Sequence, residues 1–518
     1  MLQNIWDEKK QKIGIIMAST FVFGMIAHGY MLANKISYHD DIYNLFYVGG
    51  TYGMGRWMLG IIGKICSMLG GNYSLSWWNG LASFFFLGII CFFLTEILQL
   101  KKKSSLVFSA GILVVFPVIA GLFGYMFTSF PYMIGLCMGT IGVYLITGCN
   151  NQKSVRRQNV LKVILGIFLL CCCVGVYQPY FGFCLCLLLM ELIKRSIGDD
   201  AVETKNIWKR GFWYVGTAIL ALAAYLVANK FFLFLVKKEM YHYDGVENMG
   251  IVSIGTYCKR IGIAYREFLM PARETVYDMY PMVMHGVYWL LLLAGVIFAV
   301  KNLLKMWKKS VQKAITCGLL FLLLPLGINF IFVLADVESI YTLTMYGQVL
   351  QFVFVLALSE LEQTAAEQKR WSRSIAVAGE LLILFSIIWY TRFDNMCYFK
   401  ADLLQERAKS YYTQLITRIQ QVDGYDETLP VAFVNPLEKQ IPNMTMDEEL
   451  AEIKMMPYQD NTIINNYVWD MFMAEWCGYE PTIYDGDYVT KWIDVSDMPH
   501  YPEEGSIEIR QDIIIVKF

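Results

Sequence analysis

The stretch IGIIMASTFVFGMIAHGYMLA, at residues 13–33, runs for 21 residues without an aspartate, glutamate, lysine or arginine. A helix of about 20 apolar residues crosses the roughly 30 Å hydrocarbon core of a bilayer. The run is longer than the apolar segment of a cleaved signal peptide, and no small-residue cleavage site follows it. We therefore predict that residues 13–33 form the first transmembrane helix.

The composition of the whole chain agrees with this reading. Of its 518 residues, 56% are hydrophobic and 17% are charged, and the mean hydropathy is +0.44. The apolar residues gather in runs long enough to span a membrane. Most of the 13 cysteines lie inside these runs, where a thiol behaves as a small hydrophobe, so we predict no disulfide framework. The chain is expected to be a polytopic α-helical membrane protein.

We predict eleven transmembrane helices. They are expected at residues 13–33, 77–98, 105–127, 130–148, 161–177, 179–193, 212–236, 283–300, 314–335, 344–361 and 375–391. The fifth and sixth are separated by Tyr177, Gln178, Pro179 and Tyr180. Proline interrupts a helix and tyrosines favour the membrane interface, so we interpret this point as the turn of a hairpin. One long tilted helix is the alternative, and it would invert everything that follows.

Lysine and arginine predict the orientation, because they concentrate on the cytoplasmic side of a membrane. With eleven helices and a cytoplasmic N-terminus, the cytoplasmic segments hold 23 of these residues and the outer segments hold nine. Merging the fifth and sixth helices would move the basic clusters at 301–313 and 361–374 to the outside. The charge distribution therefore favours eleven helices and places the C-terminal region outside the cytoplasm.

The C-terminal region differs from the rest in charge. Residues 393–518 carry a net charge of −14, whereas residues 1–392 carry +13. We predict a transmembrane domain at 1–392 and an extracytoplasmic α/β domain at 393–518. In the second domain we expect a helix at Ala401–Gln421 and strands at Leu429–Val434 and Ile513–Phe518. Its negative charge argues against binding to nucleic acid or to anionic lipid.

The first predicted outer loop holds the most informative polar residues. Asp40 and Asp41 follow the first span, and Arg56 and Trp57 come after the glycine-rich sequence GGTYGMG. A carboxylate can act as a general base toward a hydroxyl, an arginine fork can bind phosphate, and a tryptophan face can stack on a sugar. The structural alternative is that the acids solvate the loop or cap a helix, and that Arg56 and Trp57 anchor the interface.

This arrangement, DD followed by GRW shortly after the first span, resembles the GtrII family of bacterial glucosyltransferases, which are multispan enzymes of the broader GT-C type. Tyr177-Gln178 is similar to the family's YQ element. The sequence YDGVENMG at residues 243–250 is similar to its Y-x-G-I-x-N-M-G stretch. The resemblance extends along nearly the whole chain. Residues 341–348 depart from it, since they lack an arginine that some members carry.

The resemblance implies an enzyme of the bacterial plasma membrane. It would move a sugar, typically glucose, from a polyprenyl-phosphate donor such as undecaprenyl phosphate glucose to a cell-envelope glycan on the outer side. Enzymes of the GT-C type generally place an essential acid in the first outer loop, and Asp40 and Asp41 match that position. We favour Asp41 as the essential acid without assigning the two roles. The substrate-binding residues that it implies are Arg56, Trp57, Tyr177, Gln178 and Glu247.

Two further questions stay open at the level of sequence. No cofactor is certain, although paired carboxylates suit Mg²⁺ or Mn²⁺. The alternative function is a transporter or flippase of a lipid-linked saccharide. Such a protein should have paired halves with broken helices and charges near the membrane midplane, and we find neither clearly.

Overall fold

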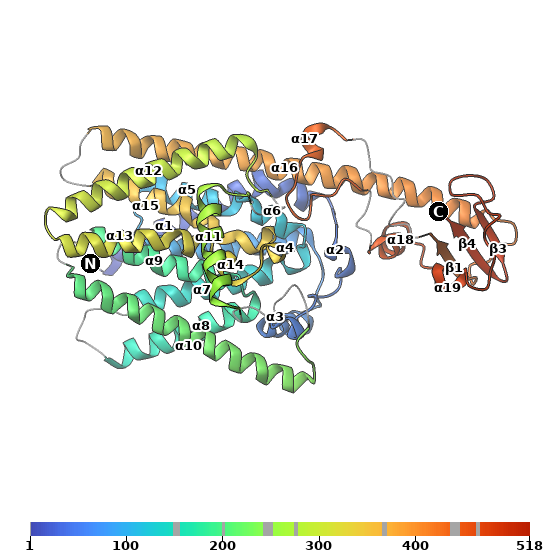
Figure 1. Ribbon diagram of the computed structural model, residues 1–518, viewed down its shortest axis with the longest axis horizontal. Coiled ribbons are helices and arrows are strands. Elements are labelled where there is room, and N and C mark those ends of the chain that lie inside the picture. Colours follow the sequence, from blue (N-terminus) through green and yellow to red (C-terminus); the bar gives the residue numbers. More distant parts are fainter. Residues whose placement is uncertain are drawn as a thin grey trace. The chain divides into compact units, whose positions relative to one another are not determined.

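The computed structural model describes residues 2–148, 156–198, 202–241, 252–273, 278–364, 370–435, 446–462 and 467–518 (Figure 1). The chain divides into two compact units. We call the first the helical unit, and it comprises residues 1–33, 46–395 and 454–456. The second, the C-terminal unit, comprises residues 34–45, 396–453 and 457–518. The start of the first predicted outer loop therefore groups with the C-terminal unit, which no sequence pattern had indicated.

The described part of the helical unit is built from helices. It contains α1 (Leu2–Ala33), η1 (Tyr52–Met54), α3 (Trp57–Met68), α4 (Ser76–Ile97), α5 (Lys103–Val115), α6 (Pro117–Phe123), η2 (Met126–Thr128), α7 (Ser129–Gly148), α8 (Arg156–Val176), α9 (Tyr180–Gly198), α10 (Thr204–Val236), α11 (Ile254–Leu269), α12 (Met282–Trp307), α13 (Val311–Ile328), α14 (Phe330–Leu334), η4 (Val337–Ser339), η5 (Thr342–Val349) and α15 (Leu350–Thr364). Helix α16 (Arg370–Gln420) begins in this unit and continues into the C-terminal unit.

Nine helices in the described part of the chain are long and apolar enough to cross a membrane, and ten if the bent pair α5 and α6 is one span. The bend of 43° follows from Pro117, because the residue before a proline avoids the helical conformation. Phe116 is accordingly extended, with φ −64° and ψ 130°. A polytopic membrane protein was predicted correctly, but eleven spans exceed the number of described helices that are long and apolar enough to cross a membrane.

The remaining predicted span is α9. It is a helix, about 28 Å long at 1.5 Å per residue, but Glu191, Lys194 and Arg195 lie in its last third, so it is not among the nine. The predicted break before it is present, since α8 ends at Val176 and α9 begins at Tyr180. The alternative of one long helix through this segment is therefore excluded.

The helices define two ends of the helical unit. Helices α1 and α4 are antiparallel, because Lys12 pairs with Glu96 at 2.6 Å at one end while Leu32 packs against Gly80 at the other. A side chain at Gly80 would lie 2.2 Å from Leu32, so glycine permits this close approach. We call the end with Lys12 the Lys12 end. Which end faces the cytoplasm stays a prediction.

The opposite end carries Arg56. Near the start of α4, Asn79 Nδ2 donates to the Met126 carbonyl at 2.9 Å, just before α7 begins. Near the start of α7, the Tyr132 hydroxyl accepts a hydrogen bond from Arg56 Nη1 at 3.0 Å. Helix α9 begins at Tyr180, whose ring contacts Tyr132, and reaches the Lys12 end, where Lys194 Nζ donates to the Leu98 carbonyl. We call this second end the Arg56 end.

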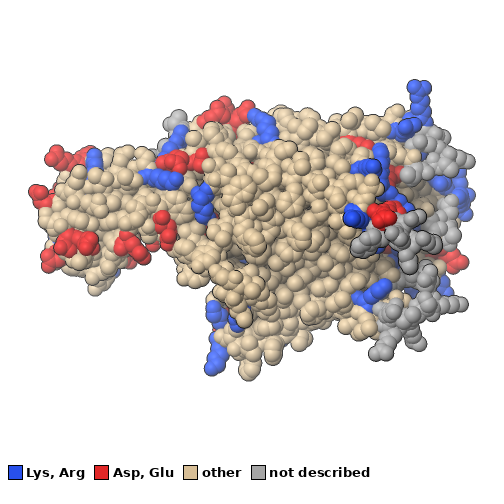
Figure 2. All heavy atoms as spheres, turned by 180° about the vertical axis from the view of Figure 1, so that it is seen from behind, with Lys and Arg blue, Asp and Glu red and all other residues tan. Residues whose placement is uncertain are grey.

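Basic residues at the Lys12 end are paired with acids. Lys102 lies 2.8 Å from Glu380, and Lys301 Nζ donates to the Glu362 carboxylate. Figure 2 shows that, on the visible face of the helical unit, charged side chains gather toward the ends of the helices and the surface between them is nearly free of charge. This distribution fits a bilayer around the middle of the bundle, where an unpaired charge is costly.

The C-terminal unit is built on one mixed sheet. It contains α2 (Asp40–Tyr43), β1 (Val431–Val434), α17 (Glu448–Ala451), α18 (Trp469–Cys477), β2 (Ile483–Asp485), α19 (Gly486–Val489), β3 (Ile507–Arg510) and β4 (Ile513–Lys517). The strand order is β2-β1-β4-β3, with β1 parallel to β2 and β4, and with β3 and β4 antiparallel. The two predicted strands are present as β1 and β4. Both are buried along their whole length, as continuous apolar runs predict.

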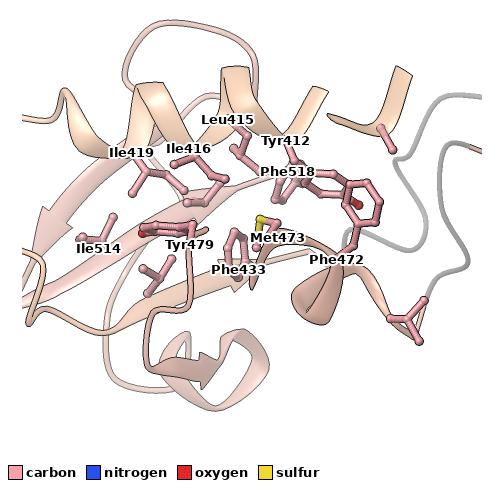
Figure 3. Close-up of a cluster of buried hydrophobic side chains, with 14 of the residues drawn as sticks. Tyr412, Leu415, Ile416, Ile419, Phe433, Phe472, Met473, Tyr479, Ile514 and Phe518 are labelled. Carbon is pink, nitrogen blue, oxygen red and sulfur yellow. The ribbon is translucent and has the colours of Figure 1, made fainter. Parts of the chain in front are cut away.

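Helix α16 supplies one side of the core of this unit. It is a single helix of 51 residues, so the predicted span at 375–391 and the predicted helix at 401–421 are continuous. Figure 3 shows Tyr412, Leu415 and Ile419 of α16 facing the sheet. The short helix α2 joins the same cluster through the buried Ile42. The backbone that carries Asp40 and Asp41 is therefore attached to this core.

Candidate active site

A hydrogen-bonded clamp fixes the loop that leads to the acid pair. The Gln405 side chain of α16 accepts from the Ser37 backbone N–H at 2.9 Å and donates to the Lys35 carbonyl at 2.8 Å. His39, directly before α2, has a φ of 54°, a left-handed conformation that is unfavourable for a residue with a side chain. Clamp and core hold this strained turn in place, so the two carboxylates have defined positions.

Asp41 points into the C-terminal unit. Its side chain is 1% exposed, and its Oδ2 atom accepts from Ser37 Oγ at 2.6 Å and from Lys35 Nζ at 3.3 Å. A buried carboxylate needs such partners, because an uncompensated charge is expensive to remove from water. Asp41 therefore stabilises the loop, and its carboxylate is not accessible to a substrate in this structure.

Asp40 is the accessible acid of the pair, with 46% of its side chain exposed. Its Oδ1 atom accepts from the Tyr467 hydroxyl, whose oxygen lies 2.6 Å from His39 Nδ1. A tyrosine hydroxyl carries a single proton, so donation to Asp40 leaves its oxygen to accept from Nδ1–H of His39. His39, Tyr467 and Asp40 thus form a hydrogen-bonded relay that ends at an exposed carboxylate.

A second charged group lies beside this relay within the C-terminal unit. Burial raises the pKa of Asp460, while the charges of His39 and Lys400 act in the opposite direction. The Lys400 side chain is buried, and its Nζ has no hydrogen-bond partner within the ranges that the structure describes. Asp460 therefore connects His39 electrostatically with a buried cation of α16.

Sequence reasoning missed Gln405, Asp460 and Tyr467. Each lies more than 350 residues after the loop that it contacts, and none belongs to a recognisable motif. One signal was available, since the polar Gln405 interrupts the apolar stripe of a helix that packs on a core. Pattern analysis could have marked it as a buried polar residue, but could not have identified its partner.

In the helical unit, the structure brings Arg56, Tyr177 and Gln178 together. Arg56 directly precedes α3, and its guanidinium lies 5.3 Å from the centre of the Tyr177 ring. The ring of Tyr132, which holds Arg56 by its hydroxyl, stacks on Tyr177 at 4.6 Å. Tyr177 is buried, and its hydroxyl has no hydrogen-bond partner among the residues with described positions. A buried hydroxyl beside a guanidinium offers donors to an anionic oxygen.

Gln178 supports the backbone just before Arg56. Its Nε2 donates to the Met54 carbonyl at 2.8 Å, and the Tyr225 hydroxyl donates to the Gly55 carbonyl at 3.1 Å. Gly55 has a φ of +72°, and a side chain there would lie 2.6 Å from the Tyr225 hydroxyl. The glycine of GRW is therefore required by the turn, and the YQ element positions that turn.

Trp57 lies in the core of the helical unit. Phe232 stacks on it at 5.0 Å with an interplanar angle of 5°, and Gly175 lies close against its edge. Trp57 is buried, so this conformation leaves no open face for a sugar. The expected stacking of Trp57 on a substrate stays a prediction that would require Phe232 to move.

Other candidates lie elsewhere. Glu247, together with the whole of the YDGVENMG segment, lies outside the described residues. Arg260 of α11 is engaged in structure, because it pairs with Asp336 at 2.7 Å and donates to the Leu334 carbonyl at 2.8 Å. In the part of the chain that can be described, no group of three or more His, Cys, Asp or Glu side chains is arranged to hold a metal ion.

Comparison with known proteins identifies the family. The family described as "Glucosyl transferase GtrII" matches residues 29–352, which is more than half of the chain. No curated protein and no solved structure matches the chain. The matched range contains Asp40, Asp41, Arg56, Tyr177 and Gln178, in agreement with the resemblance seen in the sequence. The chain is a multispan membrane protein that belongs to the GtrII glucosyl transferase family.

Proposed function

We propose that the protein transfers glucose from a polyprenyl-phosphate donor to a hydroxyl of a cell-envelope glycan, on the outer side of a bacterial plasma membrane. Membership of a glucosyl transferase family supports a glycosyltransferase role with a sugar donor and an acceptor. The observation that carries the mechanism is the exposed Asp40 carboxylate, because Asp40 lies within the range that matches the family and Tyr467 holds its carboxylate.

Asp40 is the general base of this proposal. It accepts the proton of the acceptor hydroxyl as that oxygen forms a bond to the anomeric carbon of the donor. The bond between the anomeric carbon and the phosphate oxygen breaks, and its electron pair leaves with the polyprenyl phosphate. Tyr467 holds the Asp40 carboxylate, and His39 holds Tyr467, so the base is positioned before the substrate binds. Our sequence-based preference for Asp41 is replaced, because Asp41 is buried and Asp40 is accessible.

Arg56 is the phosphate-binding residue of this proposal. The leaving phosphate gains negative charge, which a guanidinium stabilises through its planar fork. Tyr132 orients the fork, and the Tyr177 hydroxyl, which has no hydrogen-bond partner among the described residues, supplies a further donor. Gln178 acts indirectly by holding the turn at Met54 and Gly55. A lipid-linked donor also fits a chain whose helices are long and apolar enough to surround it.

The test is sugar transfer in membranes that contain the full chain at matched levels. Asp40→Asn should nearly abolish transfer from undecaprenyl phosphate glucose to the envelope glycan. Asp423→Asn, which changes an exposed acid of the same unit, is the matched control and should leave transfer unchanged. Wild-type activity of Asp40→Asn would refute the assigned base. If the wild-type protein moved a lipid-linked saccharide across the membrane without transferring sugar, the alternative function as a transporter would be correct.

A further inference from the structure

The helical unit contains an apolar groove that the proposed chemistry does not use. It lies between α12, α13 and α15, has a volume of about 480 Å³, and is closed at one point by Phe268 of α11. Apart from Tyr288 and Gln351, its walls are leucine, isoleucine, valine, phenylalanine, alanine, glycine and proline. Val296 and Leu322 line it and are also about half exposed, so the groove opens sideways on the outer surface of the bundle.

The groove is elongated along α12. Its lining residues on this helix extend from Tyr288 to Leu303, which corresponds to about 22 Å at 1.5 Å per residue. Gly295 and Gly318 leave space in it, because a Cβ added at either position would touch nothing closer than 3.6 Å. A groove of this length fits an extended hydrocarbon chain.

The polar groups of the groove are already bonded. Tyr288 and Gln351 are the two polar side chains that the described residues contribute to its lining. The Tyr288 hydroxyl donates to the Phe268 carbonyl, and Gln351 Nε2 donates to the Tyr280 hydroxyl at 3.3 Å. A ligand in the groove would therefore gain mainly packing contacts, which favours hydrocarbon.

The two ends of the groove are oriented within the helical unit. Lys301 of α12, two residues before Leu303, pairs with Glu362 of α15. Glu360, also on α15, accepts from the Lys101 backbone N–H at 2.7 Å. The Leu303 end therefore points toward the Lys12 end of the unit. The Tyr288 end points toward the Arg56 end, where we propose that the donor phosphate binds.

We propose that this groove binds the polyprenyl chain of the lipid donor, with the chain entering from the bilayer and its phosphate directed to the Arg56 end. The inference rests on the proposed donor and adds to it a binding site for the hydrocarbon. An isoprenoid chain gains little from the hydrophobic effect when it moves from lipid to protein, so van der Waals packing decides its affinity. A side chain that fills the groove should therefore act by exclusion.

The test compares two donors on purified full-length protein, undecaprenyl phosphate glucose and farnesyl phosphate glucose. Gly295→Leu and Gly318→Leu place a side chain among the lining residues. Each should raise KM for the undecaprenyl donor about tenfold, as expected for overpacking, and leave KM for the farnesyl donor unchanged. Gly286→Leu is the matched control, because it lies on the same helix outside the groove with open space around it, and should change neither value.

A second measurement separates this inference from the proposed function. Photoreactive undecaprenyl phosphate should label peptides of α12 and α13 in the wild type and label Gly295→Leu weakly. Labelling by photoreactive phosphatidylglycerol alone, or unchanged KM values in both groove variants, would overturn the inference. If the wild type used neither donor, the proposed function would be wrong, and the labelling experiment would still decide whether the groove binds the polyprenyl chain.

Discussion

Asp40→Asn removes a negative charge from the exposed end of the relay and keeps the size of the side chain. The amide can still accept a hydrogen bond from Tyr467, so the loop should keep its conformation. What is lost is the ability to take a proton from the acceptor hydroxyl. General bases contribute about 10²–10⁴-fold to rate, which corresponds to about 2.7–5.4 kcal/mol of transition-state stabilisation. We expect kcat to fall by that factor with little change in the melting temperature.

Asp41→Asn should have the opposite signature. Asp41 is buried and accepts hydrogen bonds from Ser37 and from Lys35, and hydrogen bonds to charged groups contribute about 1.5–3 kcal/mol. Because the Lys35 side chain is 41% exposed, solvent screens that part of the interaction, and we expect a loss of stability of about 1–2 kcal/mol. Transfer should fall only as far as the loop loosens.

The assay measures both quantities on the same preparations. Initial rates of glucose transfer from undecaprenyl phosphate glucose give kcat, and tryptophan fluorescence during heating gives the melting temperature of the full chain in detergent. The reasoning is refuted if Asp41→Asn loses more activity than Asp40→Asn at equal folded protein. It is also refuted if Asp40→Asn lowers the melting temperature as much as Asp41→Asn, since Asp40 would then be a structural residue.

Individual contacts lead to three further predictions, and the charge distribution leads to a fourth. Tyr467→Phe removes the hydroxyl between His39 and Asp40. We expect a roughly tenfold lower kcat in the same transfer assay, in line with the loss of a charge-assisted hydrogen bond. A pH–rate profile identical to that of the wild type would contradict the relay. Arg56→Ala should raise KM for the donor, with only partial rescue in Arg56→Lys because lysine lacks the planar fork; wild-type kinetics in both variants would make Arg56 an interface anchor. Hydrogen bonds from Thr428, Ser496 and Arg510 lower the pKa of Asp426, Asp494 and Asp497, respectively. The stability that these carboxylates contribute is present above the ordinary aspartate pKa of about 4 and is lost as the pH falls through the lowered pKa values. In thermal melts of the full chain, the triple variant Asp426→Asn, Asp494→Asn and Asp497→Asn should therefore lose less stability on acidification than the wild type. The charge distribution predicts that a reporter active only in the cytoplasm is inactive when fused after Phe518, and full activity there would invert the topology.

The helices were predictable because the signals are local. Residues 77–98 correspond to α4 within one position, and residues 13–33 end where α1 ends, since apolar length alone predicts them; α1 begins earlier, at Leu2, because its first turns are polar. The number of spans was harder to predict than the positions of the helices. Lys194 and Arg195 belong to α9 rather than to a loop after it, and apolar length gives no information about charges that are satisfied by a neighbouring helix end, as Lys194 is by the Leu98 carbonyl.

The candidate site was predictable in part for the same reason. Asp40, Asp41 and Arg56 stand out because they follow a span and resemble a family pattern. Which acid is exposed could not be predicted, because it depends on Gln405 and Ile42, whose partners lie hundreds of residues away. Trp57 shows the converse, since a residue type that suits sugar binding is buried here against Phe232.

The C-terminal unit has a consequence for the family assignment. The matched range ends at residue 352, whereas Gln405, Tyr467 and the core that holds Ile42 all lie beyond it. Part of what fixes the acid pair therefore lies outside the segment that matches the family, although the acids themselves, with Lys35 and Ser37, are inside it. A protein cut after α16 would keep Asp40 and Gln405 but lose Tyr467 and the sheet. We infer that the C-terminal unit is needed to position the general base, in addition to any contact that it makes with a substrate.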